Sequence, residues 1–133
     1  MMYYHAEQQL LLDGHVGVSK YDADTHIFIP IAPISKRERR LLSFMIAHED
    51  TLLSRAMLLS LVWRGGIVSD NSINVSVSRL RRKLRCIEPT SGCVSAVRNV
   101  GFVFSTRQTG LIQVASLDFL LSSLLWSKHA LHP

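Results

Sequence analysis

Short apolar and alternating stretches follow one another early in the chain. Residues 10–12 are apolar, residues 15–19 alternate between apolar and polar positions, and residues 26–31 are rich in β-forming residues, with an Asp13-Gly14 turn and an acidic turn at 22–24 between them. Alternation broken by such turns predicts a small antiparallel sheet, because successive side chains of a strand point to opposite faces.

Apolar positions beyond this sheet recur at helical spacing. Ser35 and Glu38 form a capping box for a first helix that runs to about His48. Ser54 is placed to cap a second helix, which carries apolar residues as far as Trp63. A glycine pair directly afterwards is expected to end this helix.

A third helix is predicted from a cap at Asp70 or Asn71 to about Arg85. At 3.6 residues per turn, four apolar residues form one narrow stripe: Ile73, Val77, Leu80 and Leu84. The opposite face has short polar residues near its start, arginines near its end and one isolated valine, Val75. Short side chains let a helix backbone approach base edges, arginines reach guanine or phosphate, and valine suits a thymine methyl group.

Residues 93–105 are predicted to form a closing β-hairpin, with Asn99 and Gly101 in or beside its turn. The order of sheet, three helices and hairpin indicates an α+β fold. We expect residues 1–9 to be a flexible N-terminus, residues 10–107 to form the domain, and residues 108–133 to form a C-terminal helical tail.

The tail contains an apolar run at 111–126 that includes Gln113 and Asp118. A membrane span needs about 20 mostly apolar residues. Leucines at helical spacing therefore favour an amphipathic apolar helix that packs on the domain or on a second copy, with membrane contact as the less favoured alternative.

Composition narrows the class of partner. The 133 residues suit one small domain, and the net charge of +5 is concentrated after residue 34. This favours a polyanionic partner, either nucleic acid or an anionic membrane surface.

Two cysteines without a CxxC pair argue against a disulfide scaffold, and the N-terminus lacks a secretory signal pattern, so a cytoplasmic location is expected. The six histidines form no ligand or catalytic motif, so we expect no enzyme activity, no metal and no cofactor.

Four stretches in this order resemble the winged helix-turn-helix domain of OmpR/PhoB-type transcriptional regulators: ISKRERRLLSFM, LLSRAMLLSLVW, NSINVSVSRLRRKL and AVRNVGFVF. The loop WRGGIVSDNS is similar to that of the ToxR/CadC-like branch. The sequence departs from the pattern of this family at two positions: Asn99, where the family commonly has glycine, and Phe102, where it commonly has tyrosine.

The resemblance implies a sequence-specific regulator of double-stranded DNA, with helix 71–85 in the major groove and hairpin 93–105 as the wing. Val75 and Arg79 are expected to read bases, Arg81 and Arg82 to hold phosphate, and Arg98 to approach the minor groove. The full set of expected DNA-binding residues is Arg55, Asn71, Ser72, Asn74, Val75, Ser78, Arg79, Arg81, Arg82 and Arg98.

The same resemblance implies association with the nucleoid, a homodimer on DNA, and contact between loop 64–70 and RNA polymerase, although this loop is equally well explained as a connector. Two alternatives remain open from the sequence. One is a protein-interaction co-regulator module that keeps the fold without reading DNA. The other is the cytoplasmic part of a membrane-anchored regulator.

Overall fold

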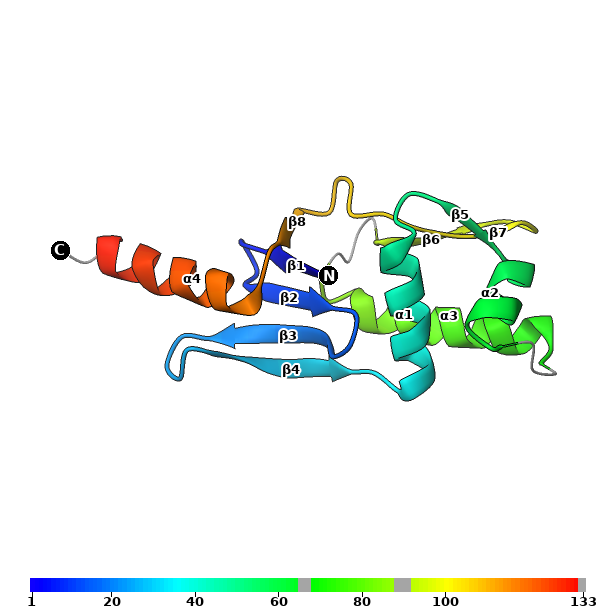
Figure 1. The fold of residues 1–133 in the computed structure, drawn as a ribbon, viewed down its shortest axis with the longest axis horizontal. Helices are drawn as coiled ribbons and strands as arrows, with labels where there is room; N and C mark the ends of the chain where they lie inside the picture. Colours follow the sequence, from blue (N-terminus) through cyan, green and yellow to red (C-terminus); the bar gives the residue numbers. More distant parts are fainter. Residues whose placement is uncertain (65–67, 88–91, 132–133) are drawn as a thin grey trace.

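The computed structural model describes residues 1–64, 68–87 and 92–131, and Figure 1 shows an elongated molecule with a sheet at one end and a helical domain at the other. Five antiparallel strands form the sheet in the order β4-β3-β2-β1-β8. Their bounds are Met2–His5 (β1), Leu10–Asp13 (β2), Gly17–Asp22 (β3), Ile27–Pro33 (β4) and Leu111–Val114 (β8). The antiparallel sheet predicted over residues 10–31 is therefore present, with a strand added on its β2 side from each end of the chain.

The expectation of a flexible segment at residues 1–9 was wrong. Met2–His5 pairs with β2 on one side and with β8 on the other, where Met2 lies opposite Val114 and His5 opposite Leu111. Tyr3 and Tyr4 are both buried, one on each face of the sheet. Burial of these two aromatic side chains, together with ladder hydrogen bonds on both sides, holds this terminal segment in place.

Three helices and a second sheet form the other end of the molecule (Figure 1). The helices are Lys36–Ala47 (α1), Arg55–Leu61 (α2) and Asp70–Leu84 (α3). The capping box of Ser35 and Glu38 and the cap at Ser54 are confirmed, since both serine hydroxyls accept from the backbone three residues on. Strands Leu52–Ser54 (β5), Val94–Val97 (β6) and Gly101–Phe104 (β7) form a sheet in the order β5-β7-β6, so the predicted hairpin is present and gains a strand.

Gly101 allows β7 to lie against β5. A Cβ atom at this position would be 2.0 Å from the Leu53 carbonyl oxygen and 2.9 Å from the Ser54 Cα. Both are backbone atoms, which cannot rotate away as a side chain can. Glycine is therefore required here by close approach of two strands.

One hydrophobic core joins the two ends of the molecule. Tyr3, Leu10 and Leu12 from the inner face of the five-stranded sheet pack in the same cluster as the buried side chains of α1, α2, α3 and β7. This continuity fixes the position of α3 relative to the sheet.

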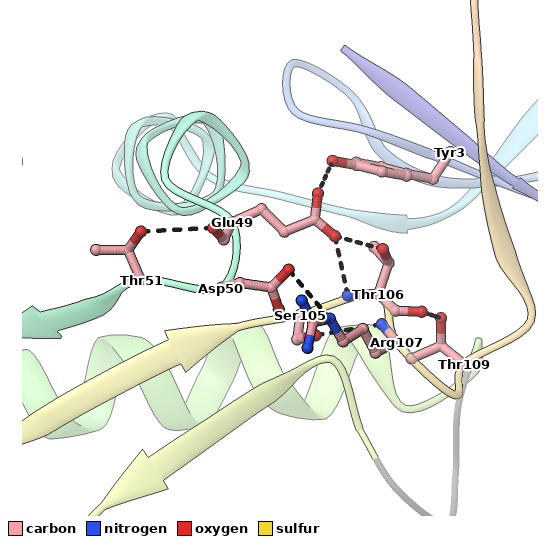
Figure 2. Close-up of polar contacts among 8 residues, drawn as sticks. All are labelled: Tyr3, Glu49, Asp50, Thr51, Ser105, Thr106, Arg107 and Thr109. Carbon is pink, nitrogen blue, oxygen red and sulfur yellow. Dashed lines mark hydrogen bonds and ion pairs between the residues drawn. The ribbon is translucent and has the colours of Figure 1, made fainter.

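A polar network around Glu49 reinforces the junction (Figure 2). The Glu49 carboxylate accepts hydrogen bonds from the Tyr3 hydroxyl at 2.8 Å, from the Thr106 amide at 3.1 Å and from the Thr106 hydroxyl. Arg107 adds an ion pair to Asp50. Burial, reinforced by the Glu49 carboxylate, raises the pKa of the Tyr3 phenol. The network connects β1, the segment after α1 and the segment after β7.

The C-terminal helix Leu117–Leu131 (α4) extends away from the rest of the molecule (Figure 1). It begins later than residue 111, the start of the predicted run, because Leu111–Val114 is used as strand β8. Leu120 packs against Tyr4 and Leu11 on the outer sheet face, whereas Phe119 and Trp126 are exposed. Within the described part of the chain, no helix combines the length and apolar character needed to cross a membrane.

Candidate nucleic-acid interface

Helix α3 is docked by one face and exposed by the other. The predicted stripe is confirmed, since Ile73, Val77, Leu80 and Leu84 are all buried in the main core. Burying four such side chains contributes several kcal/mol of hydrophobic stabilisation. The helix is therefore held rigidly, and its outer face is presented to solvent.

The cap of α3 lies one or two residues before the predicted position. Its cap is Ser69, not Asp70 or Asn71, and the Ser69 hydroxyl accepts from the Ser72 amide at 3.2 Å. The Ser69 and Ser72 hydroxyls also lie 3.1 Å apart. Serine, aspartate and asparagine are all good capping residues, so local sequence alone left the choice among neighbours open.

The outer face of α3 carries most of the residues expected to contact DNA. Val75 is 39% exposed, and five polar residues beside it are exposed: Asn71, Ser72, Ser78, Arg79 and Arg82. The exposed apolar surface of Val75, in the middle of a polar helical face, contributes no hydrophobic stabilisation to the fold. The surface is thus suited to a partner with both apolar and charged groups.

A groove of about 340 Å³ separates α3 from the β6–β7 hairpin. It brings together five of the expected residues, which come from α2, α3 and the hairpin turn: Arg55, Asn74, Ser78, Arg81 and Arg98. This groove will be called the wing groove. Its charged groups are all cationic.

Arg55 is the most constrained residue of the wing groove. Its Nε and Nη2 atoms both donate to the Asn74 Oδ1, at 3.3 and 3.1 Å, and its guanidinium lies 5.6 Å from the centre of the Phe102 ring. Because the Asn74 oxygen is occupied in this way, its amide nitrogen is left as the group available to a partner. Phe102, where the family commonly has tyrosine, serves here as a platform for Arg55.

The hairpin turn presents Arg98 to solvent. Asn99 beside it has a positive φ of 63°, which confirms that asparagine meets the conformational demand that glycine commonly meets at this point. Arg98, Asn99 and Val100 are all exposed, so the tip of the hairpin is free to enter a groove in a partner.

A second groove, of about 530 Å³, lies on the other side of α3, where α3 faces the first turns of α1. We call it the α1 groove. Its charged lining residues are Lys36, Arg37, Glu38, Arg40, Arg79 and Lys83. Of these, only Arg79 was expected to contact DNA. The basic run KRERR was visible in the sequence, but the position of α3 beside it was not.

Glu38 forms the floor of the α1 groove and is almost fully buried. Its Oε1 accepts from Lys83 Nζ at 2.7 Å and from the Ser35 amide at 2.9 Å. Burial opposes ionisation of this carboxyl, but the hydrogen bonds from Lys83 and Ser35 outweigh it and hold the Glu38 pKa below its usual range. Glu38 is therefore ionised and neutralised by Lys83 at neutral pH.

Arg37 is held at one end of the α1 groove by an aromatic contact. Its guanidinium lies 5.6 Å from the centre of the Trp63 ring, which belongs to the segment after α2. Trp63 Nε1 is buried and has no hydrogen-bond partner within the described residues.

The loop expected to contact RNA polymerase, 64–70, lies partly outside the described residues, since 65–67 are not described.

Sequence comparison identifies a match over most of the helical domain. The family model described as "Transcriptional regulatory protein, C terminal" matches residues 32–104. The transcriptional regulatory protein PrrA of Mycobacterium leprae is 45% identical over 73 residues, which are 53% of this chain and 30% of PrrA. This chain therefore spans about a third of the length of the curated relatives that it matches.

Solved structures share the fold. The DNA-binding domain of Escherichia coli CadC aligns with 80% of this chain and 92% of its own, with a TM-score of 0.59 and 22% identity. The DNA-binding domain of the response regulator AdeR, in complex with an intercistronic region, aligns with 73% of this chain and 94% of its own, with a TM-score of 0.55 and 21% identity. At these identities the likeness is one of fold, and it confirms the predicted α+β winged helix-turn-helix.

Proposed function

This chain belongs to the OmpR/PhoB-type family of C-terminal domains of transcriptional regulatory proteins, and from this we propose that it binds double-stranded DNA sequence-specifically to regulate transcription. Helix α3 enters the major groove and the β6–β7 hairpin acts as the wing. The function is that of a binding module and not of an enzyme.

The observation that carries this proposal is the way α3 is presented. Its apolar stripe is buried, and its outer face exposes Val75 between polar residues and arginines. A helix of this kind fits the major groove, which is about 12 Å wide and displays thymine methyl groups beside hydrogen-bonding base edges. A co-regulator that had lost DNA binding would have no need of a cationic groove on each side of this helix.

Individual roles follow from position on α3 and on the wing. Val75 and Arg79 read base edges, because they lie on the exposed face at the middle of the helix. Arg81 and Arg82 hold phosphate, and Arg98 approaches the minor groove from the wing tip. Four further residues at the start of α2 and α3 and along the outer face complete the contact surface: Arg55, Asn71, Ser72 and Ser78, with the Asn74 amide nitrogen beside Arg55.

We propose that the chain dimerises on DNA, because members of this family generally bind as tandem or symmetric pairs. Contact of loop 64–70 with RNA polymerase and residence on the nucleoid are parts of the same proposal. Their support is the family membership.

A titration of fluorescence anisotropy tests DNA binding. The probe is a labelled duplex enriched by the protein from a random-sequence library, measured from about 50 to 200 mM salt. We expect log affinity to fall linearly with log salt, with a slope that corresponds to roughly six to ten phosphate contacts. Failure of the library selection to enrich any duplex, or absence of binding at the lowest salt concentration, would overturn the proposed function.

A further inference from the structure

The α1 groove concentrates positive charge along one side of α3, and most of this charge comes from α1. Five Lys or Arg side chains line it, from α1 and from α3, together with one carboxylate, Glu38. Lys83 pairs with Glu38 at 2.7 Å. Among the described residues Lys36, Arg40 and Arg79 form no ion pair, and all three are exposed.

The two basic grooves lie on opposite flanks of α3. The wing groove is lined by Asn74, Ser78 and Arg81 of this helix, whereas the α1 groove is lined by Ser76, Arg79 and Lys83. The buried stripe and the outer face separate these two sets around the helix. Cationic side chains therefore lie along both flanks of α3.

The major groove of DNA is bounded by two sugar–phosphate strands. A helix that lies in the groove approaches both strands, one on each flank. The wing groove accounts for contact with one strand only. The other strand must run past the α1 side of α3.

We propose that the α1 groove binds the phosphates of this second strand through Lys36 and Arg40, with Arg79 directed between the groove and the bases. This inference rests on the proposed function. Lys36 and Arg40 come from the first half of α1, outside the helix-turn-helix pair itself, and extend the contact surface beyond α2, α3 and the wing.

The carboxylate in the groove does not oppose this assignment. Glu38 is buried beneath the cations, and its charge is compensated by Lys83 and by the Ser35 amide. Arg37 is drawn toward the Trp63 ring. Lys36, Arg40 and Arg79 are left as the cations free to meet an anion.

The test removes two charges from the groove. Lys36→Gln combined with Arg40→Gln is compared with a matched control, Lys20→Gln combined with Arg39→Gln. All four residues are exposed, and neither control residue lines the α1 groove. The control has the same net charge as the groove variant; its Arg39 is adjacent to Arg40 on α1, and its Lys20 lies on β3.

Affinity for the enriched duplex is measured for both variants from 50 to 200 mM salt. Each lost phosphate contact lowers the slope of log affinity against log salt by about 0.9. For the groove variant, which lacks two contacts, we expect a slope that is smaller by about 1.8. Between 50 and 200 mM salt, the factor by which its affinity decreases should therefore be roughly ten times smaller than the factor for the unaltered chain. The control should lose much less. Ethylation of single phosphates should inhibit the unaltered chain on both strands that flank the major groove, and the groove variant should become insensitive on one strand.

The outcomes separate this inference from the proposed function. Failure of the unaltered chain to enrich or bind any duplex overturns both. Normal binding by the unaltered chain, with equal slopes for the groove variant and the control, overturns the second-strand contact alone. Circular dichroism melting of each variant, and the single change Arg40→Gln, exclude a folding defect as the cause of a lost contact.

Discussion

Removal of the Lys83 charge tests whether the ion pair on the floor of the α1 groove holds α1 against α3. The change Lys83→Met keeps an unbranched apolar stem and deletes only the ammonium group. Loss of the ammonium group removes the hydrogen bond from Lys83 to the buried Glu38 carboxylate. A hydrogen bond to a charged group contributes about 1.5–3 kcal/mol to stability. The Lys83 side chain is 33% exposed and the Glu38 side chain 8% exposed, so solvent screens the pair in part. Glu38 also keeps its bond from the Ser35 amide. We therefore expect a loss of about 1–2 kcal/mol in the free energy of unfolding at pH 7.

The loss should depend on pH in a defined direction. Because the folded state lowers the Glu38 pKa, its ionised form stabilises the fold above the ordinary glutamate pKa of about 4.3, and this stability is lost as pH falls through the lower folded pKa. Once Glu38 is protonated, Lys83 has no charge to pair with. The difference between Lys83→Met and the unaltered chain should therefore shrink below about pH 4.

Urea unfolding at pH 7 and at pH 3 measures this difference directly. Arg82→Met on the same helix is the control, since Arg82 is exposed and no ion pair to it is found among the described residues; it should cost only a few tenths of a kcal/mol. Glu38→Gln keeps the capping geometry but removes the charge, and it should abolish most of the effect of Lys83→Met when the two are combined. An equal loss at both pH values would refute an electrostatic origin of the stabilisation.

Three further predictions concern recognition, strand packing and the junction. Arg79→Ala should reduce preference for the enriched duplex by about 1–3 kcal/mol, whereas Arg82→Ala should weaken all duplexes alike and lower the salt slope by about one; equal effects in anisotropy assays would remove the base-reading role of Arg79. Gly101→Ala should destabilise by more than about 2 kcal/mol in thermal melts, because its Cβ would overlap the β5 backbone; an unchanged melting temperature would contradict this. Tyr3→Phe should lower the free energy of unfolding by about 1–2 kcal/mol by removing the bond to the Glu49 carboxylate, and an equal loss in a Glu49→Ala background, which has no acceptor, would show that this bond is not its cause.

Local patterns predicted the elements of the helical domain well. The capping box at Ser35 and Glu38, the cap at Ser54 and the inward stripe of α3 involve residues within a few positions of each other. Their energetics are decided by nearby backbone atoms and by one helical period. The positive φ of Asn99 could likewise be predicted from the sequence, because turn conformation is a local property.

Long-range pairing was not predicted. Strands β1 and β8 come from opposite ends of the chain, and LIQV at 111–114 continues into a leucine-rich helix without a break in apolar character. Short apolar runs of this kind are compatible with either a strand or a helix, and only the presence of an unpaired edge at β1 decides between them. Strand β5 was missed for the same reason, since three residues carry no periodicity of their own.

Residue type and spacing were enough to predict that one helix buries an apolar stripe and exposes a polar face with Val75 and Arg79. They also showed that positive charge is concentrated beyond residue 34 and that the chain resembles OmpR/PhoB-type regulators. These properties depend on residue type and local spacing. The tertiary structure alone decided that Arg55 is held by Asn74 and Phe102, and that the cations of KRERR line one groove with Arg79 and Lys83. Glu38 and Lys83 are 45 residues apart in the chain, and they meet only because the shared core fixes α1 against α3.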